Sequence, residues 1–161
     1  MDLGNNIIPF HWSSYTIGST IAGGLMLIGG ILLMIFLKQY SLWIRVPLGC
    51  ILGITLLVSL YFLPISLVVG NENITIKCLV NRTVIPKSTI KRIYKIKTNN
   101  SFHSKREFGS SGAFGLVGIF SNDMLGKFTM YATELETRIV IETESKNYVI
   151  SCSEWQKLIT E

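Results

Sequence analysis

Two long apolar stretches dominate the first third of the sequence. The first, Ile17 to Leu37, and the second, Val46 to Leu63, contain no charged residue. About 20 helical residues cross a bilayer core about 30 Å thick, and a helix that is apolar on every face belongs in lipid or in a large core. The rest of the chain is too short to bury two such helices. The pattern therefore predicts a transmembrane helical hairpin over residues 17–64, after an N-terminal tail of residues 1–16.

The predicted hairpin has consequences for topology and for packing. Two crossings place both ends of the chain on the same side of the membrane. Lys38 and Arg45 flank the linker, and the next basic residue after the second stretch is Lys77, so the positive-inside rule leaves the side of the following domain open. Small residues four positions apart allow two helices to approach closely in lipid. The residues expected to make this contact within the hairpin are Ser19, Gly23, Gly49 and Gly53.

From residue 65 onward the pattern changes to short stretches in which apolar and polar residues alternate, with turn residues between them. Such alternation predicts half-buried β-strands, and their spacing predicts a small antiparallel sandwich or barrel over residues 65–161. The expected strands are Ile74–Val80, Arg82–Ile85, Ile90–Lys97, Phe114–Phe120, Lys127–Ala132, Arg138–Thr143 and Tyr148–Ser151. The polar, glycine-bearing segment Asn99–Ser111 is expected to be a long mobile loop.

The end of the sequence has the pattern of a helix. Ser153 is a suitable N-cap residue, and Trp155, Leu158 and Ile159 form one apolar face. We expect this helix to cap the barrel. The predicted fold class is therefore an α+β membrane protein, with a transmembrane hairpin before a β-domain that ends on a helix.

Composition and charge narrow the possible partners. The chain has 161 residues, of which 16% are charged, and a mean hydropathy of +0.43. This charged fraction is below the roughly 25% of soluble domains. From residue 65 onward, 13 basic and 9 acidic residues give a net charge of +4. A basic domain tethered to a membrane favours anionic lipid headgroups over nucleic acid as a partner.

Several segments of the β-domain resemble one known family. They are Arg106–Leu116, Gly118–Phe120, Gly126–Thr133, Val140–Thr143 and Lys146–Ser151, together with the final helix. The glycine and aromatic pattern is similar to that of the bacterial pleckstrin-homology (PH-like) domain family, in which paired transmembrane helices often precede the domain. The resemblance implies two near-orthogonal sheets capped by a C-terminal helix, and it implies no catalytic residue and no established ligand. An OB-type barrel, as in the NfeD-like membrane proteins, is the alternative, but that fold usually places its helix between strands.

Basic residues cluster in the middle of the β-domain. On a strand, Lys91, Lys95 and Lys97 share one face, and several cations near an anionic leaflet attract the domain to it at about 1 kcal/mol each. An ordinary solvated strand face explains the same pattern. The candidate residues for binding lipid or a partner are Lys87, Lys91, Arg92, Lys95, Lys97, Lys105 and Arg106.

Catalytic and metal-binding patterns are not evident in the sequence. His11 and His103 have no cysteine or carboxylate spacing around them that indicates a metal site. The three cysteines, Cys50, Cys78 and Cys152, are too widely spaced for a zinc site, and we interpret them as free thiols, although an oxidising compartment would allow a bridge between the last two. We therefore expect no enzyme activity, no cofactor and no metal.

The predicted function is a non-catalytic binding or scaffold module that engages a protein partner or anionic lipid headgroups. An accessory subunit of a membrane enzyme or transporter is the alternative. The expected location is the inner (cell) membrane of a bacterium, which the chain crosses more than once.

Overall fold

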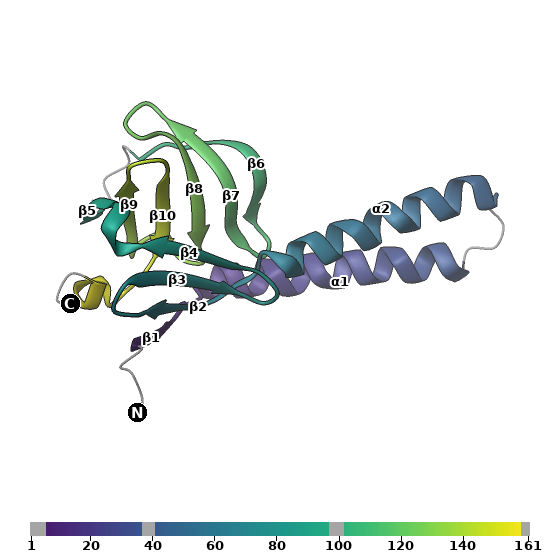
Figure 1. The fold of residues 1–161 in the computed structure, drawn as a ribbon. Coiled ribbons are helices and arrows are strands. Elements are labelled where there is room, and N and C mark those ends of the chain that lie inside the picture. The colour runs from purple at the N-terminus through teal and green to yellow at the C-terminus, as the bar shows by residue number, and fades with distance from the viewer. Residues whose placement is uncertain (1–5, 37–40, 97–101, 159–161) are drawn as a thin grey trace.

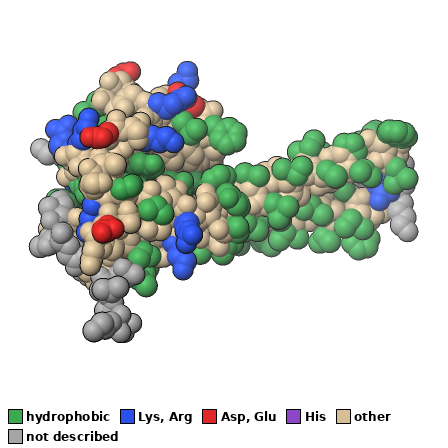
Figure 2. Space-filling view, viewed as in Figure 1, with side chains coloured by type: hydrophobic (Ala, Val, Ile, Leu, Met, Phe, Trp, Pro, Cys, Tyr) green, Lys and Arg blue, Asp and Glu red, His purple; other side chains and the backbone are tan. Residues whose placement is uncertain are grey.

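The structure of the protein is a computed structural model that describes residues 6–36, 41–96 and 102–158 (Figure 1). A long arm of two antiparallel helices, α1 (Ser14–Phe36) and α2 (Leu42–Tyr61), projects from a domain built of β-strands. Both helices are long and apolar enough to cross a membrane, and neither apolar stretch is buried by the described residues. On the face shown in Figure 2, hydrophobic side chains cover the arm along its length. The two predicted apolar helices are confirmed.

The two helices contact each other in the middle of the arm and at its far end. A Cβ placed on Gly30 would lie only 3.1 Å from Leu52 Cδ1, so a glycine allows the close approach at this position. At the far end, the guanidinium of Arg45 donates hydrogen bonds to the carbonyl oxygens of Met34 (2.8 Å) and Ile35 (2.9 Å). These carbonyls lie in the last turn of α1, where no intrahelical donor is available. Arg45 therefore fastens the two helices together at the linker.

The small residues expected to join the helices lie elsewhere. A Cβ on Gly49 or Gly53 would meet no described atom within 4 Å, so these two glycines face open space. Ser19 and Gly23 contact the β-domain, as described below. The expectation is corrected on this point: the close approach of the two helices is at Gly30, while Ser19 and Gly23 contact the β-domain and Gly49 and Gly53 contact neither.

The first sheet contains four antiparallel strands in the order β1-β2-β3-β4. The strands are β1 (Asn6–Pro9), β2 (Pro64–Val69), β3 (Asn73–Cys78) and β4 (Arg82–Pro86). β1 precedes α1 and β2 follows α2, yet the two strands pair directly, with Ile8 opposite Leu67. The pairing of β1 with β2 therefore holds the start of α1 and the end of α2 together at the sheet.

The second sheet contains six strands in the order β5-β9-β10-β8-β7-β6. Its strands are β5 (Ile90–Lys95), β6 (Lys105–Gly112), β7 (Gly115–Asn122), β8 (Gly126–Ala132), β9 (Arg138–Thr143) and β10 (Asn147–Ser151), and the short 3-10 helix η1 (Lys87–Thr89) precedes β5. All pairs are antiparallel except β8 and β10, which run parallel. β5 and β6 are the two edges of this sheet.

Strand β6 corrects one expectation from the sequence. The segment predicted as a mobile loop, Asn99–Ser111, contains most of β6, although residues 97–101 lie outside the described residues. β6 pairs with β7 only, and a shift of register between Arg106 and Phe108 bends it. Because an exposed, bent edge strand buries little, its residues do not alternate between apolar and polar.

The predicted C-terminal helix is also corrected. Among the described residues the segment forms a single 3-10 turn, η2 (Trp155–Leu158), and Ile159 lies outside them. A 3-10 helix has three residues per turn, so residues i and i+3 share one face. Trp155 and Leu158 have this spacing, and both pack against the core between the sheets. One turn is thus enough to bury Leu158 and to pack the partly buried Trp155 against the core.

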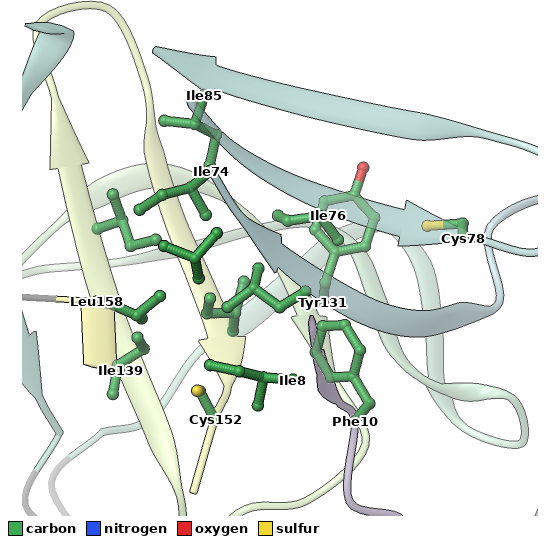
Figure 3. Close-up of a cluster of buried hydrophobic side chains, with 14 of the residues drawn as sticks. Ile8, Phe10, Ile74, Ile76, Cys78, Ile85, Tyr131, Ile139, Cys152 and Leu158 are labelled. Carbon is green, nitrogen blue, oxygen red and sulfur yellow. The ribbon is translucent and has the colours of Figure 1, made fainter. Parts of the chain in front are cut away.

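The core consists of two clusters, one on each face of the six-stranded sheet. The cluster between the two sheets contains Ile8, Phe10, Leu67, Val69, Ile74, Ile76, Cys78, Ile85, Val117, Tyr131, Ile139, Ile141, Ile150, Cys152 and Leu158 (Figure 3). The other face buries Ile96, Phe120, Phe128, Met130, Ala132, Val140 and Val149. Successive residues of a strand point to opposite faces, so a fully buried run such as Ile139–Ile141 shows that this sheet is covered on both sides.

The thiols of Cys78 and Cys152 are free and buried in the cluster between the sheets, and Figure 3 shows them on different sides of it. Burial raises the pKa of Cys78 to about 11, so this thiol stays protonated and unreactive at neutral pH.

Candidate functional site

The first turns of α1 are attached to the turn between β6 and β7. Ser19 Oγ donates a hydrogen bond to the carbonyl oxygen of Gly112 (3.1 Å), and Phe114 N–H donates one to Thr20 Oγ1 (2.9 Å). A Cβ on Gly23 would lie 2.9 Å from Ala113 Cβ, which is closer than real Cβ atoms approach, so only glycine fits without a shift. The β-domain therefore covers one side of α1 as far as Gly23.

A second attachment lies between the start of α1 and the loop that follows β8. Thr133 is almost completely buried there. Its Oγ1 donates to the carbonyl oxygen of His11 (2.6 Å), its own carbonyl oxygen accepts from Ser13 N–H (3.4 Å), and its N–H donates to Ser151 Oγ (3.0 Å). These bonds join the segment before α1 to β10 and to the β8–β9 loop, so α1 leaves the domain in a fixed direction.

A hollow of about 390 Å³ opens beside this junction. It is lined by Ser13, Tyr15, Thr16, Gly112, Gly115, Leu116, Glu134, Leu135 and Glu136. Glu134 already accepts a hydrogen bond from Thr137 Oγ1 (3.0 Å). Within the part of the chain that the structure describes, no group of three or more histidine, cysteine, aspartate or glutamate side chains is arranged to hold a metal. The hollow offers two carboxylates and hydroxyl groups, and its lining contains no histidine or cysteine.

The basic residues predicted to bind lipid or a partner lie on different elements. The structure places Lys87 in η1, Lys91, Arg92 and Lys95 on β5, and Lys105 and Arg106 on β6, while Lys97 lies outside the described residues. Four strands separate β5 from β6 in the sheet. The six described residues therefore form two groups at opposite edges of the six-stranded sheet.

The basic side chains of β5 differ in whether they form ion pairs within the protein. Arg92 forms an ion pair with Glu142 (2.9 Å) on β9 and lies over the ring of Tyr94, whose hydroxyl also donates to Glu142 (2.9 Å). Against the opposing effect of burial, the hydrogen bonds from Tyr94 and Arg92 lower the pKa of Glu142 below its ordinary value. The charge of Arg92 is therefore largely matched within the protein.

The ammonium group of Lys87 is buried and has no hydrogen-bond partner among the described residues. Lys91 and Lys95 are exposed, and neither forms an ion pair with a described residue. Lys91 still attracts the carboxylate of Glu142 at longer range. Within the described part of β5, these two lysines are the basic residues without a direct ion pair.

Comparison with protein families identifies the β-domain. Residues 65–161 match the family model described as Bacterial PH domain. The chain is a member of the bacterial PH domain family. This confirms the resemblance that the glycine and aromatic segments indicated. Comparison with curated proteins and with solved structures gives no match.

The matched range begins at β2, yet this bacterial PH domain also uses residues outside it. β1 lies before the hairpin, pairs with β2 and contributes Ile8 and Phe10 to the core. Domains of this family are generally binding modules without chemistry of their own. Their functional surface must therefore be sought in exposed side chains and strand edges.

The sequence analysis missed one exposed feature of the PH domain, the turn between β3 and β4. Leu79 and Val80 form its tip and are 50% and 68% exposed. The N–H of Leu79 donates to the carbonyl oxygen of Leu63 (2.8 Å), two residues beyond α2. Lys77 and Arg82 face each other across the two strands just before and after the tip. The sequence pattern predicts a strand over Ile74–Val80, whereas β3 ends at Cys78, so the pattern did not reveal the turn.

Proposed function

We propose that this protein is a membrane-anchored, non-catalytic binding module whose PH domain receives an acidic, extended segment of a protein partner at strand β5. The two apolar helices anchor the domain by crossing the cell membrane twice. Their length and their exposed apolar surface support this role, because a helix that is apolar on all sides and not buried by protein requires lipid.

The observation that carries the proposal is the position of β5. It is the edge strand farthest from β6, the strand at which the domain contacts α1, and in Figure 1 it lies on the side of the domain away from the helical arm. A surface in this position faces the aqueous phase and is accessible to a soluble partner. It is poorly placed to meet the membrane in which its own helices lie.

The chemistry of β5 fits an acidic strand. An edge strand pairs with a neighbour on one side only, and the backbone N–H and C=O groups on its other side can pair with an added strand. Lys91 and Lys95 are exposed beside this edge, and neither forms an ion pair with a described residue, although Lys91 attracts Glu142 at longer range. Lysines on an edge strand also prevent aggregation by pairing with the edges of other chains. The experiment must therefore distinguish lysines that attract a partner from lysines that only prevent aggregation.

The test is site-specific photocrosslinking in the membranes of cells that naturally produce the protein. A photoreactive amino acid replaces Ser88, which is exposed beside β5, or Met124, which is exposed in the β7–β8 turn. We expect a discrete protein adduct from position 88 and none from position 124. Lys91→Glu with Lys95→Glu should abolish the adduct, whereas Lys91→Arg with Lys95→Arg should retain it.

Three results would contradict the proposal: no adduct at position 88, equal adducts at both positions, or an adduct that survives the change to glutamate. Unchanged thermal unfolding of the glutamate variant shows that the loss of an adduct does not come from loss of the fold. Because the attraction is electrostatic and exposed, added salt should weaken the adduct in the parent protein.

A further inference from the structure

We propose that the turn between β3 and β4 inserts into the surface of the bilayer on the side of the PH domain, with Leu79 and Val80 in the acyl boundary and Lys77 and Arg82 at anionic headgroups. The inference rests on the membrane anchoring in the proposed function, but it concerns a different surface from β5. It assigns a second site of contact with lipid besides the two helices.

The depth of the turn follows from the length of α2. A helix of 20 residues rises about 30 Å, which equals the thickness of the hydrocarbon core. If Trp43 and the first turn of α2 lie at one boundary, Tyr61 lies at the other. The hydrogen bond from Leu79 to Leu63 places the tip of the turn within one bond of the chain that leaves α2. The turn is therefore at the level of the headgroups.

The packing of α1 draws the domain closer still to the bilayer. The β6–β7 turn covers α1 as far as Gly23, which leaves residues 24–36, or about 20 Å of helix at 1.5 Å per residue, free of the domain. This length is shorter than a hydrocarbon core of about 30 Å. The part of the domain that contacts α1 must therefore reach or enter the near boundary of the hydrocarbon core, and the side of the domain next to the arm cannot stand away from the bilayer in water.

The side chains of the β3–β4 turn suit this environment. Leu79 and Val80 are adjacent and exposed, and the hydrogen bond from Leu79 to Leu63 holds them beside the end of α2. A single exposed apolar residue on a protein surface needs no explanation, but two together at this position do. Lys77 and Arg82 are exposed, and neither forms an ion pair with a described residue. Apolar residues at the acyl boundary with cations at the headgroups are the arrangement by which amphipathic segments bind anionic membranes.

The experiment uses the full chain, reconstituted into vesicles of phosphatidylcholine, alone or mixed with phosphatidylglycerol. In a Cys50→Ser background, an environment-sensitive fluorophore is attached at Val80→Cys or, as the matched control, at Met124→Cys. Met124 is also an apolar residue in an exposed turn, 78% exposed, but its turn joins β7 and β8. Cys78 and Cys152 are buried, so they compete little for the label.

We expect the label at position 80 to emit at shorter wavelength than the label at position 124. A lipid carrying a quencher near its headgroup should quench it several-fold more strongly, and a water-soluble quencher several-fold less. Lys77→Gln with Arg82→Gln should reduce the additional effect of phosphatidylglycerol. An emission at position 80 as polar as that at position 124, with equal access for the water-soluble quencher, would overturn the insertion.

Flotation of the same vesicles separates this failure from failure of the anchoring. Protein that floats with the vesicles after alkaline extraction, but whose label at position 80 lies in water, contradicts only the insertion. Protein that is released by alkaline extraction contradicts the anchoring and the insertion together.

Discussion

Strand β1 should be essential to the PH domain, although the two helices separate it in sequence from the rest of the domain. Ile8 is 4% exposed and packs in the cluster between the sheets, opposite Leu67 on β2. Its neighbour Ile7 lies on the other face of the same strand and is 65% exposed. We predict that Ile8→Ala strongly destabilises the domain and that Ile7→Ala, the same chemical change one residue earlier, does not.

The expected difference can be estimated from burial. Removing a buried isoleucine side chain down to alanine costs about 2–5 kcal/mol, whereas an exposed substitution stays within about 0.5 kcal/mol. For a domain of about 100 residues, 1 kcal/mol shifts Tm by about 4–8 °C. Ile8→Ala should therefore lower Tm by at least about 8 °C and Ile7→Ala by at most about 4 °C.

The assay is thermal unfolding of the full chain in detergent micelles, followed by tryptophan fluorescence. Trp12 and Trp155 pack against the same cluster as Ile8 and so report on its loss, whereas Trp43 is exposed on α2. Equal Tm shifts for the two variants would refute the reasoning, because they would mean that β1 adds nothing to the core. The matched range of the family, residues 65–161, would then be a complete domain by itself.

Three further predictions concern contacts elsewhere in the domain. Gly23→Ala should loosen the β6–β7 turn from α1 and speed hydrogen exchange there, whereas Gly24→Ala, whose Cβ meets no described atom within 4 Å, should leave exchange unchanged. Gly118→Ala should prevent stable folding, because the φ of Gly118 is +136° and an added Cβ would lie 2.2 Å from a carbonyl oxygen of β6. Gly126 has a φ of +64° and open space around it, so Gly126→Ala should lower the free energy of unfolding, measured with denaturant, by only about 1 kcal/mol. The lowered pKa of Glu142 means that its carboxylate stabilises the fold above the unfolded pKa of about 4.3 and that this contribution is lost as pH falls through the folded value. Tm should therefore fall below about pH 4, and Glu142→Gln should remove that part of the decline.

The sequence was sufficient where a signal lies within a continuous stretch. A long stretch without a charge predicts a helix that is long and apolar enough to cross a membrane, and both such helices were predicted. Most strands of the six-stranded sheet were predicted as well, because residues such as Ile139–Thr143 have high β-propensity and lie between clear turns. The glycine pattern around Gly118 also indicated the family, and the structure explains it by the close approach of β6 and β7.

The missed elements depend on contacts between distant parts of the chain. β1 has only four residues, one of them a proline, and its partner β2 follows more than 50 residues later. β2 begins at Pro64, three residues after the last residue of α2, and its residues are almost all apolar, so they lack the alternation that marks the later strands. No periodicity can separate such a strand from the helix before it.

The candidate site was predicted less completely than the fold. Lysines and arginines close together in sequence suggested one surface, but β5 and β6 lie at opposite edges of a six-stranded sheet. Conversely, Leu79 and Leu63 are far apart in the sequence, yet a backbone hydrogen bond joins them in the structure. Neighbourhood in sequence is a poor guide to a binding surface when sheet order, rather than chain order, decides which residues meet.

The central claim is that the chain crosses the membrane twice and that β1, before the helices, pairs with β2, after them, in one PH domain. Disulfide trapping in membranes tests this claim most directly. Ile7 on β1 lies opposite Val68 on β2. In a Cys50→Ser background, Ile7→Cys with Val68→Cys should form a disulfide that peptide mapping detects without reduction. The control, Ile7→Cys with Val84→Cys, places the second thiol on β4, three strands or about 14 Å away. That distance exceeds the limit of about 7 Å between Cα atoms for a disulfide, so no bond should form. Absence of the bond between positions 7 and 68, or equal bonding in both pairs, would contradict the account, because a hairpin that does not return to the same side cannot bring β1 and β2 together.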